Sequence, residues 1–564
     1  MSSILSTTAL ETVLAYHEQT KHHVGRYARS LGYMDWETQP DPFRRYDGAE
    51  ILLLDEVPPA PEPGYDAAFW PGATEPRPVD RSSISQLFYD SLALSAWKEM
   101  GTARWSLRVN PSSGALHPTE GYLVAGPIAG LSRTAALYHY SPLRHGLEVR
   151  TALSSRDWSD LTIGLPPGAL LVGLASIHWR ESWKYGERGF RYCHHDAGHA
   201  IAAVAVAASV LGWKAHVLEG WADRDLAVLL GVARQNGVEA EHSDCLLVIY
   251  PAGEDYPLEH RRAHRPTPDL LDRLSRLPMA GEANQLSPEH HSWPVIDEVA
   301  EATARTQPPQ TSYWEPRAEK QAPPRRPSGI SARRIIRQRR SAVAMDRRSG
   351  LNREIFYGML ERVLRRQDAV PFDSLPWKPA VHLVLFVHRV EELEAGLYIL
   401  ARHPDATGDL KAAMRSEFEW SRPAGCPDDL PLYRLVRGDC RGVARFVSCG
   451  QDIAADGAFA LAMIGEFEPS LREHGPWFYK RLHWETGVIG QVLYLEAEAA
   501  GVRSTGIGCF FDDALHQAAG LDGRRYQDIY HFTVGGAVDD PRLRTLPAYG
   551  LPSTPVKLRG IQFP

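Results

Sequence analysis

Several features that would identify common protein classes are missing from this 564-residue sequence. It contains no run of 18 apolar residues, so it predicts no membrane-spanning helix. Its first residues lack the basic and then apolar pattern of a secretory signal peptide. Its six cysteines form no CxxC pair, which excludes a zinc ribbon or a disulfide scaffold and is typical of reduced thiols in a cytoplasmic protein.

The sequence also lacks a strong excess of positive or negative charge. Lys and Arg number 62 against 69 Asp and Glu, so neither nucleic acid nor a membrane surface is an expected partner. No GxGxxG or GxxxxGK[ST] follows a predicted strand, so the sequence does not indicate a dinucleotide or nucleoside-triphosphate fold. A hydrophobic content of 44% and a charged content of 23% are typical of a soluble globular protein. The length predicts about two to four domains.

The chain repeats itself at a fixed separation. Four glycine or glycine-adjacent positions of the first half recur 289 residues later. The matching positions are Gly198 and Gly487, Gly212 and Gly501, Gly220 and Cys509, and Gly231 and Gly520. Upstream, Arg81-Ser82 and Arg340-Ser341 stand 259 residues apart, which we attribute to an insertion in the second copy. We interpret the pattern as a tandem duplication; the alternative is two unrelated α/β domains with similar glycine positions.

Each copy predicts a helical opening, strands with intervening helices, a long apolar helix, a glycine turn and a last strand. The predicted strands are 121–126, 170–177, 245–250, 381–387 and 459–464. The helices predicted at 197–211 and 487–500 are apolar on most faces, which indicates burial in a core or an interface.

Four segments follow from this organisation. Residues 1–79 form an N-terminal helical extension with an amphipathic helix near residues 10–31. Residues 80–255 form the first domain and 331–564 the second. Between them, 256–330 has the Pro- and Arg-rich composition of a linker.

A polar loop precedes the first predicted strand. It reads Asn110-Pro-Ser-Ser-Gly-Ala-Leu-His-Pro-Thr-Glu120. Adjacent hydroxyls, a glycine and two prolines make a rigid loop that offers small donors and backbone N–H groups to a flat polar ligand. An ordinary turn before a strand is the alternative.

Two clusters of arginine indicate a phosphate site in the second copy. Arg339 and Arg340 stand beside Ser341, and Arg542 and Arg544 alternate along an extended segment, so they share one side of it. Guanidinium groups match the oxygens of a phosphate. Either cluster alone is also typical of a solvated basic surface.

Two further motifs lie in the first copy. Lys184 and Tyr185 form an acid/base pair if burial lowers the pKa of the lysine, although such a pair is usually found on a surface. His195 and His199 have the i, i+4 spacing of a zinc-binding helix, but no third ligand follows at a recognisable spacing. We therefore predict no metal site.

Together these motifs resemble the nitroreductase superfamily of FMN enzymes, and the first copy is similar to the SagB-type dehydrogenases, which oxidise thiazolines and oxazolines in modified peptides. The resemblance covers residues 80–255 and 330–550, and the Pro-Ser-Ser-Gly loop is its most specific element. It implies an α+β fold, with a mixed, mostly antiparallel sheet wrapped by helices. It also implies two such domains that form an intramolecular pseudo-dimer, with flavin at the interface.

The two copies depart from the family pattern in complementary ways. The second copy keeps Arg-Arg-Ser, where the first reads Asp80-Arg81-Ser82. The first copy keeps the Pro-Ser-Ser loop, where the second has Val-Pro-Phe-Asp-Ser at 370–374. We therefore expect one complete FMN site, and a degenerate second one built on Arg81, Glu219 and Gly220.

The resemblance assigns the residues of the complete site. From the second copy come Arg339, Arg340, Ser341, Arg542 and Arg544 at the phosphate, Gly508 and Cys509 near flavin N5, and Gln451 near the pyrimidine edge. From the first copy come Pro111, Ser112, Ser113, Gly114 and His117. Lys184 and Tyr185 match the catalytic Lys-Tyr of azoline oxidases, and the second copy has Glu473-His474 at their place.

These assignments predict an FMN-dependent dehydrogenase or oxidase that acts on a peptide-derived or heterocyclic natural-product intermediate. An NAD(P)H-dependent nitro or quinone reductase is one alternative. A flavin-free scaffold protein of a modification complex is the other. The expected partners are a small-molecule or peptide substrate and other biosynthetic enzymes, in the cytoplasm.

Overall fold

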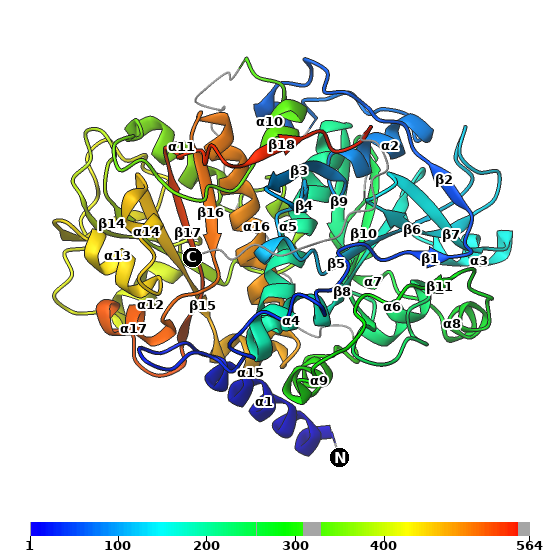
Figure 1. The fold of residues 1–564 in the computed structure, drawn as a ribbon, viewed down its shortest axis with the longest axis horizontal. Helices are drawn as coiled ribbons and strands as arrows, with labels where there is room; N and C mark the ends of the chain where they lie inside the picture. Colours follow the sequence, from blue (N-terminus) through cyan, green and yellow to red (C-terminus); the bar gives the residue numbers. More distant parts are fainter. Residues whose placement is uncertain (1, 71, 255, 308–328, 551–564) are drawn as a thin grey trace.

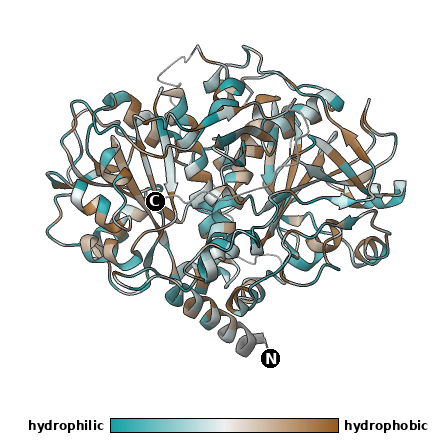
Figure 2. Cartoon of the chain, in the orientation of Figure 1, coloured by the Kyte–Doolittle hydropathy of each residue, from teal (hydrophilic) through white to brown (hydrophobic). Residues whose placement is uncertain are grey.

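The computed structural model describes residues 2–70, 72–254, 256–307 and 329–550. Two antiparallel sheets, one in each half of the chain, lie on either side of a central pair of helices (Figure 1). Apolar residues gather on the strands and the central helices, whereas the outer loops are mostly hydrophilic (Figure 2). The α+β class and the mostly antiparallel sheets that the sequence predicts are confirmed.

The sheet of the first half has the strand order β2-β7-β6-β5-β8-β10-β9. Its strands are β2 (Ile51–Leu53), β5 (Thr119–Ala125), β6 (Ala136–Ser141), β7 (Gly146–Ala152), β8 (Leu170–Ile177), β9 (Trp213–Val217) and β10 (Glu241–Pro251). Its helices are η1 (Tyr65–Phe69), α2 (Arg81–Tyr89), η2 (Ser113–Ala115), α3 (Ser155–Leu161), α4 (His178–Tyr185), η3 (Gly186–Arg188), α5 (Gly189–Val210) and α6 (Asp223–Leu229).

The sheet of the second half has the order β14-β13-β12-β15-β17-β16, which repeats the first apart from β2. Its strands are β12 (Val381–Val387), β13 (Gly396–Leu400), β14 (Leu432–Arg437), β15 (Phe459–Glu466), β16 (Arg503–Ile507) and β17 (Tyr526–Gly535). Its helices are α10 (Ala332–Gln338), α11 (Arg353–Arg362), η4 (Phe372–Ser374), α12 (Ala406–Ala413), α13 (Arg441–Val447), α14 (Ile453–Asp456), α15 (Glu468–His474), α16 (Phe478–Ala499) and α17 (Asp512–Ala519).

The central helices α5 and α16 both have 22 residues and meet backbone to backbone at two glycines. A Cβ on Gly198 would lie 2.2 Å from the carbonyl oxygen of Trp484, and one on Gly487 would lie 2.1 Å from that of His195. Trp484 is itself the counterpart of His195 at the 289-residue separation. Since each helix makes the same contact with the other, the interface has the reciprocity of a two-fold dimer.

Polar contacts across the interface are reciprocal too. Arg191 binds Asp512 at 2.8 Å, and the counterpart pair Lys480 and Asp223 meets at 2.5 Å. Near the start of each copy, the Tyr65 N–H donates to the Ile330 carbonyl oxygen and the Ala332 N–H donates to that of Pro63. These contacts relate the two halves by a pseudo-two-fold axis, as the tandem duplication predicts.

The backbone hydrogen bonds of Tyr65 and Ala332 correct the sequence-based alignment of Arg81-Ser82 with Arg340-Ser341. They match residues 63 and 65 with 330 and 332, so Gly72-Ala73-Thr74, and not Asp80-Arg81-Ser82, is the counterpart of Arg339-Arg340-Ser341. Arg81 instead binds the Asp55 carboxylate at 3.1 Å, two residues after the end of β2. The arginine-serine dipeptide misled the alignment because it occurs in both copies at unrelated places.

Both ends of the described chain cross to the opposite half (Figure 1). Helix α1 (Ser2–Gln19) leads to Lys21, which binds Asp513 of the second half at 2.9 Å. Strand β18 (Arg544–Leu546) pairs with β3 (Leu94–Met100), which forms a hairpin with β4 (Ala103–Arg108). The predicted helix over 10–31 therefore ends at Gln19, and the N-terminal extension is helical only in part.

The segment expected to be a linker has structure of its own in its described part. It carries α7 (Leu258–Ala263), α8 (Pro268–Ser275), α9 (Pro294–Ala302) and β11 (Glu282–Ala283), which pairs with β1 (Tyr46–Asp47) of the N-terminal segment. Leu270 and Leu274 of α8 are buried in the core of the first half. The prolines at 308–309, 323–324 and 327 lie outside the described residues.

Candidate functional site

A cavity of about 630 Å³ opens between the two halves. The first half contributes the loop after β4, together with Lys98 and the side of the hairpin. The second half contributes the segment that follows α10 and the segment before β18. The sequence-predicted residues on its wall are Pro111, Ser112, Gly114, His117, Arg339, Arg340 and Ser341. The two motifs expected to meet across the interface therefore face one cavity.

The Pro-Ser-Ser-Gly loop is held in an unusual backbone conformation. Gly114, Ala115 and His117 have φ values of 61°, 56° and 54°, the left-handed region that only glycine adopts freely. The Ser112 hydroxyl accepts a hydrogen bond from the His117 N–H at 2.8 Å, which closes the turn. Ser113 turns away from the cavity and donates its N–H to the Asp196 carboxylate at 3.2 Å, which ties the loop to α5.

His117 is buried and neutral on this wall. Burial lowers the pKa of its imidazole well below the usual range, and Arg108 lowers it further. Nε2 lies 3.1 Å from the Ser106 carbonyl oxygen, so it carries the proton. Nδ1 has no hydrogen-bond partner among the described residues. The loop therefore holds a buried acceptor atom available to a ligand.

Guanidinium groups crowd the other wall. Arg339 donates to the carbonyl oxygens of Arg108 and Val109 at 3.1 Å, and its guanidinium stacks 4.9 Å from the centre of the Tyr494 ring. Burial and, next in importance, the charge of neighbouring Arg339 lower the pKa of Arg340 to about 9. The Nε atoms of both arginines are buried without a partner in the described part of the chain.

Two cations that the sequence reasoning missed join this group. Lys98 reaches the cavity from β3 and Arg503 from β16. Burial lowers the pKa of Lys98, and Arg340 and Arg503 lower it too. Such mutual destabilisation of positive charge is relieved by a bound anion. Neither residue stands in a motif, and only the fold brings them together.

Arg542 and Arg544 lie elsewhere. They do share one side of an extended segment, but that side faces solvent, and Arg542 binds Asp540 at 2.7 Å. The alternate residues Pro541, Leu543 and Thr545 line the cavity instead. Alternation along an extended chain fixes which residues share a side and leaves open which side faces inward.

The residues expected near the flavin ring lie beyond this cavity. The Tyr192 hydroxyl donates to the Gly508 carbonyl oxygen at 2.9 Å, and a Cβ on Gly508 would lie 2.0 Å from the Tyr192 ring. The Gln451 amide donates to the Cys509 carbonyl oxygen at 2.9 Å. Tyr192 thus fills the space next to the glycine turn, a place that the sequence analysis did not assign to it.

Lys184 and Tyr185 end α4 directly behind the loop. A Cβ on Gly114 would lie 2.8 Å from the Tyr185 hydroxyl and 3.1 Å from Lys184 Nζ. Burial lowers the pKa of Lys184, and the neighbouring Glu181 opposes that shift. Burial raises the pKa of Tyr185 well above its usual range. Both functional groups therefore lie at the one residue of the loop that has no side chain.

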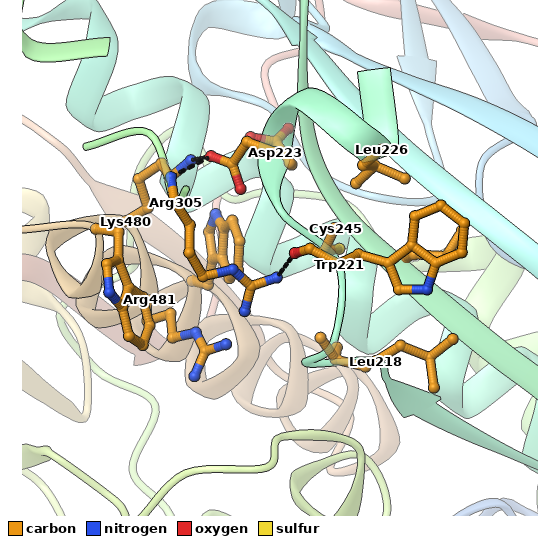
Figure 3. A pocket seen from close by; sticks show the side chains of 13 residues that line it. Leu218, Trp221, Asp223, Leu226, Cys245, Arg305, Lys480 and Arg481 are labelled. Atoms are coloured by element: carbon orange, nitrogen blue, oxygen red, sulfur yellow. Dashed lines mark hydrogen bonds and ion pairs between the residues drawn. The ribbon is translucent and has the colours of Figure 1, made fainter. Parts of the chain in front are cut away.

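The counterpart region on the other side of the axis is filled. Figure 3 shows Arg305, Lys480 and Arg481 beside a pocket of about 20 Å³. Arg481, the counterpart of Tyr192, binds Glu219, the counterpart of Gly508, at 2.9 Å. A second pocket of about 20 Å³ lies where Gly72 and Thr74 replace the Arg-Arg-Ser residues.

His195 and His199, which have the spacing of a zinc-binding helix, lie in the helix interface. His195 stacks on Tyr530 with ring centres 4.3 Å apart, and its Nδ1 lies 2.8 Å from the Thr486 hydroxyl. His199 Nε2 lies 3.4 Å from the Tyr530 hydroxyl. Among the described residues, no helix combines the length and the apolarity that crossing a membrane requires.

Comparisons with known proteins show similarity to nitroreductases. The nitroreductase family matches residues 386–536. A "Putative nitroreductase" of Methanocaldococcus jannaschii is 29% identical over 128 residues, which are 22% of this chain and 63% of that protein. The trifolitoxin-processing protein TfxB of Rhizobium leguminosarum bv. trifolii is 35% identical over 111 residues, 18% of this chain and 29% of that protein. This chain therefore matches less than two thirds of the length of either relative.

The likeness in structure extends much further than the likeness in sequence. A crystal structure of a "putative nitroreductase" from Anabaena variabilis superposes with a TM-score of 0.67 at 21% identity, over 93% of this chain and 99% of that one. The two-sheet fold is thus shared along nearly the whole length. Residues 386–536 of the chain form a nitroreductase-family domain, within a fold that both halves share with the Anabaena variabilis protein.

Proposed function

We propose that the protein is an FMN-dependent oxidoreductase with one working site, in the cavity between its halves. The observation that carries the proposal is the meeting of the Pro-Ser-Ser-Gly loop of one copy with the Arg-Arg-Ser residues of the other. A volume of about 630 Å³ lies in the range of small-molecule sites.

The residues present fit the phosphate end of this cofactor. Arg339 and Arg340 carry buried Nε atoms without partners among the described residues, and Lys98 adds positive charge beside them. Arg503 also reaches this wall, where it forms an ion pair with Asp539 at 2.5 Å. A phosphate accepts hydrogen bonds from such groups. Arg542 and Arg544 are not part of this arrangement, because both side chains are about three-quarters exposed.

At the ring end the fit rests on the first copy. Pro111, Ser112 and Gly114 offer a flat wall, and the Nδ1 atom of His117 offers an acceptor. Gln451, Gly508 and Cys509 stay predictions for this end, because Tyr192 fills the space next to Gly508.

Lys184 and Tyr185 are the proposed acid/base groups. FMN, when bound, supplies a hydride acceptor. The protein supplies Lys184, whose pKa burial lowers, as the group that takes a proton from a substrate C–H bond. Gly114 lines the cavity, and both groups lie directly behind it, where a Cβ on this residue would meet them.

For the substrate we propose a peptide-derived azoline or a similar heterocycle. The similarity to TfxB, whose name describes it as trifolitoxin-processing, supports this class. The oxidative direction also gives Lys184 and Tyr185 a role as base, whereas a quinone or nitro reductase needs no such pair.

The test is a pair of measurements on the full-length protein. Bound flavin released on denaturation should approach one per chain, and oxygen uptake with an azoline peptide should exceed NADPH oxidation with menadione. No flavin after reconstitution with FMN would favour a scaffold protein. Flavin with menadione activity alone would favour a reductase.

A further inference from the structure

The N-terminal arm, residues 20–38, lies against the end of α4 that carries Lys184 and Tyr185 (Figure 1). It contains neither a helix nor a strand, and many of its residues are exposed. Lys21 at its start binds the second half, and residues 29–38 contact α4. Because the arm has no regular structure of its own, its path is fixed by such contacts.

Gly186 ends α4 and receives the backbone of the arm. Its φ of 56° and ψ of −135° lie in a region that glycine adopts far more freely than other residues. A Cβ on Gly186 would lie 2.2 Å from the Arg29 carbonyl oxygen and 2.7 Å from the Ser30 Cα. The same carbonyl oxygen accepts the Glu187 N–H at 3.0 Å. The arm therefore approaches α4 at a point where only glycine leaves room for it.

Trp183 holds the arm on the other side of Lys184 and Tyr185. Its indole N–H donates to the Asp35 carbonyl oxygen at 3.2 Å and to the Thr38 hydroxyl at 3.1 Å. Its ring centre lies 5.6 Å from that of Trp36. Trp36 and Tyr185 both pack against the apolar cluster that contains Trp183. The indole is thus joined to the arm by hydrogen bonds and by packing.

Glu187, directly after Gly186, is held from the same direction. The Tyr16 hydroxyl of α1 donates to its carbonyl oxygen at 2.6 Å, and the Gln19 amide donates to its carboxylate at 2.8 Å. Arg29 Nε lies 3.6 Å from the same carboxylate. The chain that leaves α4 is therefore fixed by α1 and by the arm together.

Lys184 and Tyr185 lie between these fixed points, with Trp183 before them and Gly186 after them. The last turn of a helix frays most readily, because its carbonyl groups lack partners within the helix. Here the arm covers that turn on one side. On the other side the loop approaches, since a Cβ on Gly114 would lie 2.8 Å from the Tyr185 hydroxyl and 3.1 Å from Lys184 Nζ. The pair is thus held between the loop and the arm.

The described residues place no such arm at the counterpart end, the last turn of α15. Gly475 is the counterpart of Gly186 and also has a positive φ, of 109°, but a Cβ there would first meet the Trp477 side chain, at 3.0 Å. Arg472 stands at the place of Trp183, and its side chain is 62% exposed and pairs within its own helix. The arm therefore belongs to the side of the molecule that has the open cavity.

We propose that the N-terminal arm is part of the active site. Trp183 and Gly186 are positioning residues, which seat the arm and so fix Lys184 and Tyr185 against the loop. The inference rests on the proposed function of Lys184 and Tyr185. It gives the N-terminal extension a role in turnover, which it exerts through the end of α4.

The first test requires neither flavin nor substrate. Hydrogen exchange of the full-length protein, followed by mass spectrometry, should speed up about tenfold at residues 183–188 in Trp183→Phe, which keeps a ring but loses the hydrogen bonds to the arm. Gly186→Ala, which pushes the arm away, should show at least the same change.

Each variant has a matched control. Trp420→Phe removes an indole N–H that has no partner among the described residues. Gly475→Ala imposes a similar backbone strain on the closed side, where the described chain places no arm. Both controls should leave exchange at residues 183–188 unchanged. Equal exchange in Trp183→Phe and Trp420→Phe would overturn the proposal.

The second test uses the bound flavin. Its reduction by saturating substrate, followed by stopped flow, should be about tenfold or more slower in Trp183→Phe, because small displacements of a catalytic group are costly. Flavin content, the flavin spectrum and KM should stay as in the wild-type protein. Loss of flavin with an unchanged rate per bound flavin would show that the arm merely stabilises the fold, and would overturn the proposal.

The two tests separate this inference from the function on which it rests. If the wild-type protein binds no flavin after reconstitution, the proposed function fails. The exchange experiment then decides by itself whether the arm fixes the end of α4.

Discussion

The two sides of the pseudo-two-fold axis share one fold, but one side has an open cavity and the equivalent region of the other is filled. On one side a cavity of about 630 Å³ is walled by a serine-rich loop and by two arginines whose Nε atoms have no partner among the described residues. On the other, pockets of about 20 Å³ remain, and the ion pair Arg481–Glu219 stands where the open side has Tyr192 and Gly508. Once two copies share one chain, each half is free to lose the residues that its partner supplies.

The largest effect that we expect is the loss of FMN binding when the cations of the open side are removed. Arg339→Ala combined with Arg340→Ala should weaken FMN binding about 100-fold or more, because each charged hydrogen bond to a phosphate contributes about 1.5–3 kcal/mol. Flavin retained after gel filtration measures this. Arg542→Ala is the control, since Arg542 is exposed and bound to Asp540. Equal loss in both variants would contradict the site.

Lys184→Ala should leave FMN bound and lower turnover about 100-fold, the lower end of what acid–base groups contribute. Its counterpart Glu473→Ala, on the closed side, should not change turnover. Stopped-flow reduction of the bound flavin by substrate separates this step from reoxidation. Equal rates in the wild-type protein and Lys184→Ala would remove the residue from the mechanism.

The buried ion pairs differ in strength across the axis. Asp512 is contacted by both Arg188 and Arg191, and these arginines outweigh the effect of burial and lower its pKa to about 2. Because this pKa lies below the unfolded value, the stability is present at neutral pH and is lost as pH falls through about 4 to 2.

Asp512→Asn should therefore lower the free energy of unfolding by about 3 kcal/mol at pH 7, and by less at pH 3. Denaturant titrations at the two pH values measure the difference. Asp223→Asn, the matched substitution on the other side, should cost less, since Asp223 is more exposed than Asp512. A larger loss in Asp223→Asn would reverse the comparison.

The smallest effects that we expect are losses of stability at the contact between α5 and α16, where the two halves are alike. Gly198→Ala and Gly487→Ala should each lower the free energy of unfolding by about 1–3 kcal/mol, because either Cβ meets a backbone carbonyl oxygen of the facing helix. Thermal unfolding should show similar shifts for both. Gly442→Ala in α13, where a Cβ has open space, is the control. Strongly unequal shifts would show that the axis does not pass between these glycines.

Much of the fold could be predicted because its signals are local. The strands at 170–177 and 381–387 match the observed bounds, since continuous apolar runs mark buried strands. The 289-residue separation identified two 22-residue helices that prove to be counterparts. The loop at 111–117 and the arginines at 339–340 were recognisable as motifs, and the structure brings both to one cavity.

What could not be predicted depends on distant contacts. Lys98 and Arg503 reach the cavity through strand pairing, which no local pattern reveals. Arg542 faces outward because the crossing of β18 to β3 decides which side of its segment is covered. The counterpart of Arg339 was misplaced because sequence identity in a dipeptide is weaker than the reciprocity of backbone hydrogen bonds.

Because each half holds one end of the other half's chain, cleavage between the halves should not separate them. The first half holds the last strand of the second, and the second half holds the N-terminal arm of the first through Lys21. A protease cut between residues 307 and 329 should therefore yield two fragments that stay together as a non-covalent heterodimer. Each fragment would lack a segment that the other now holds, so we expect neither to fold alone.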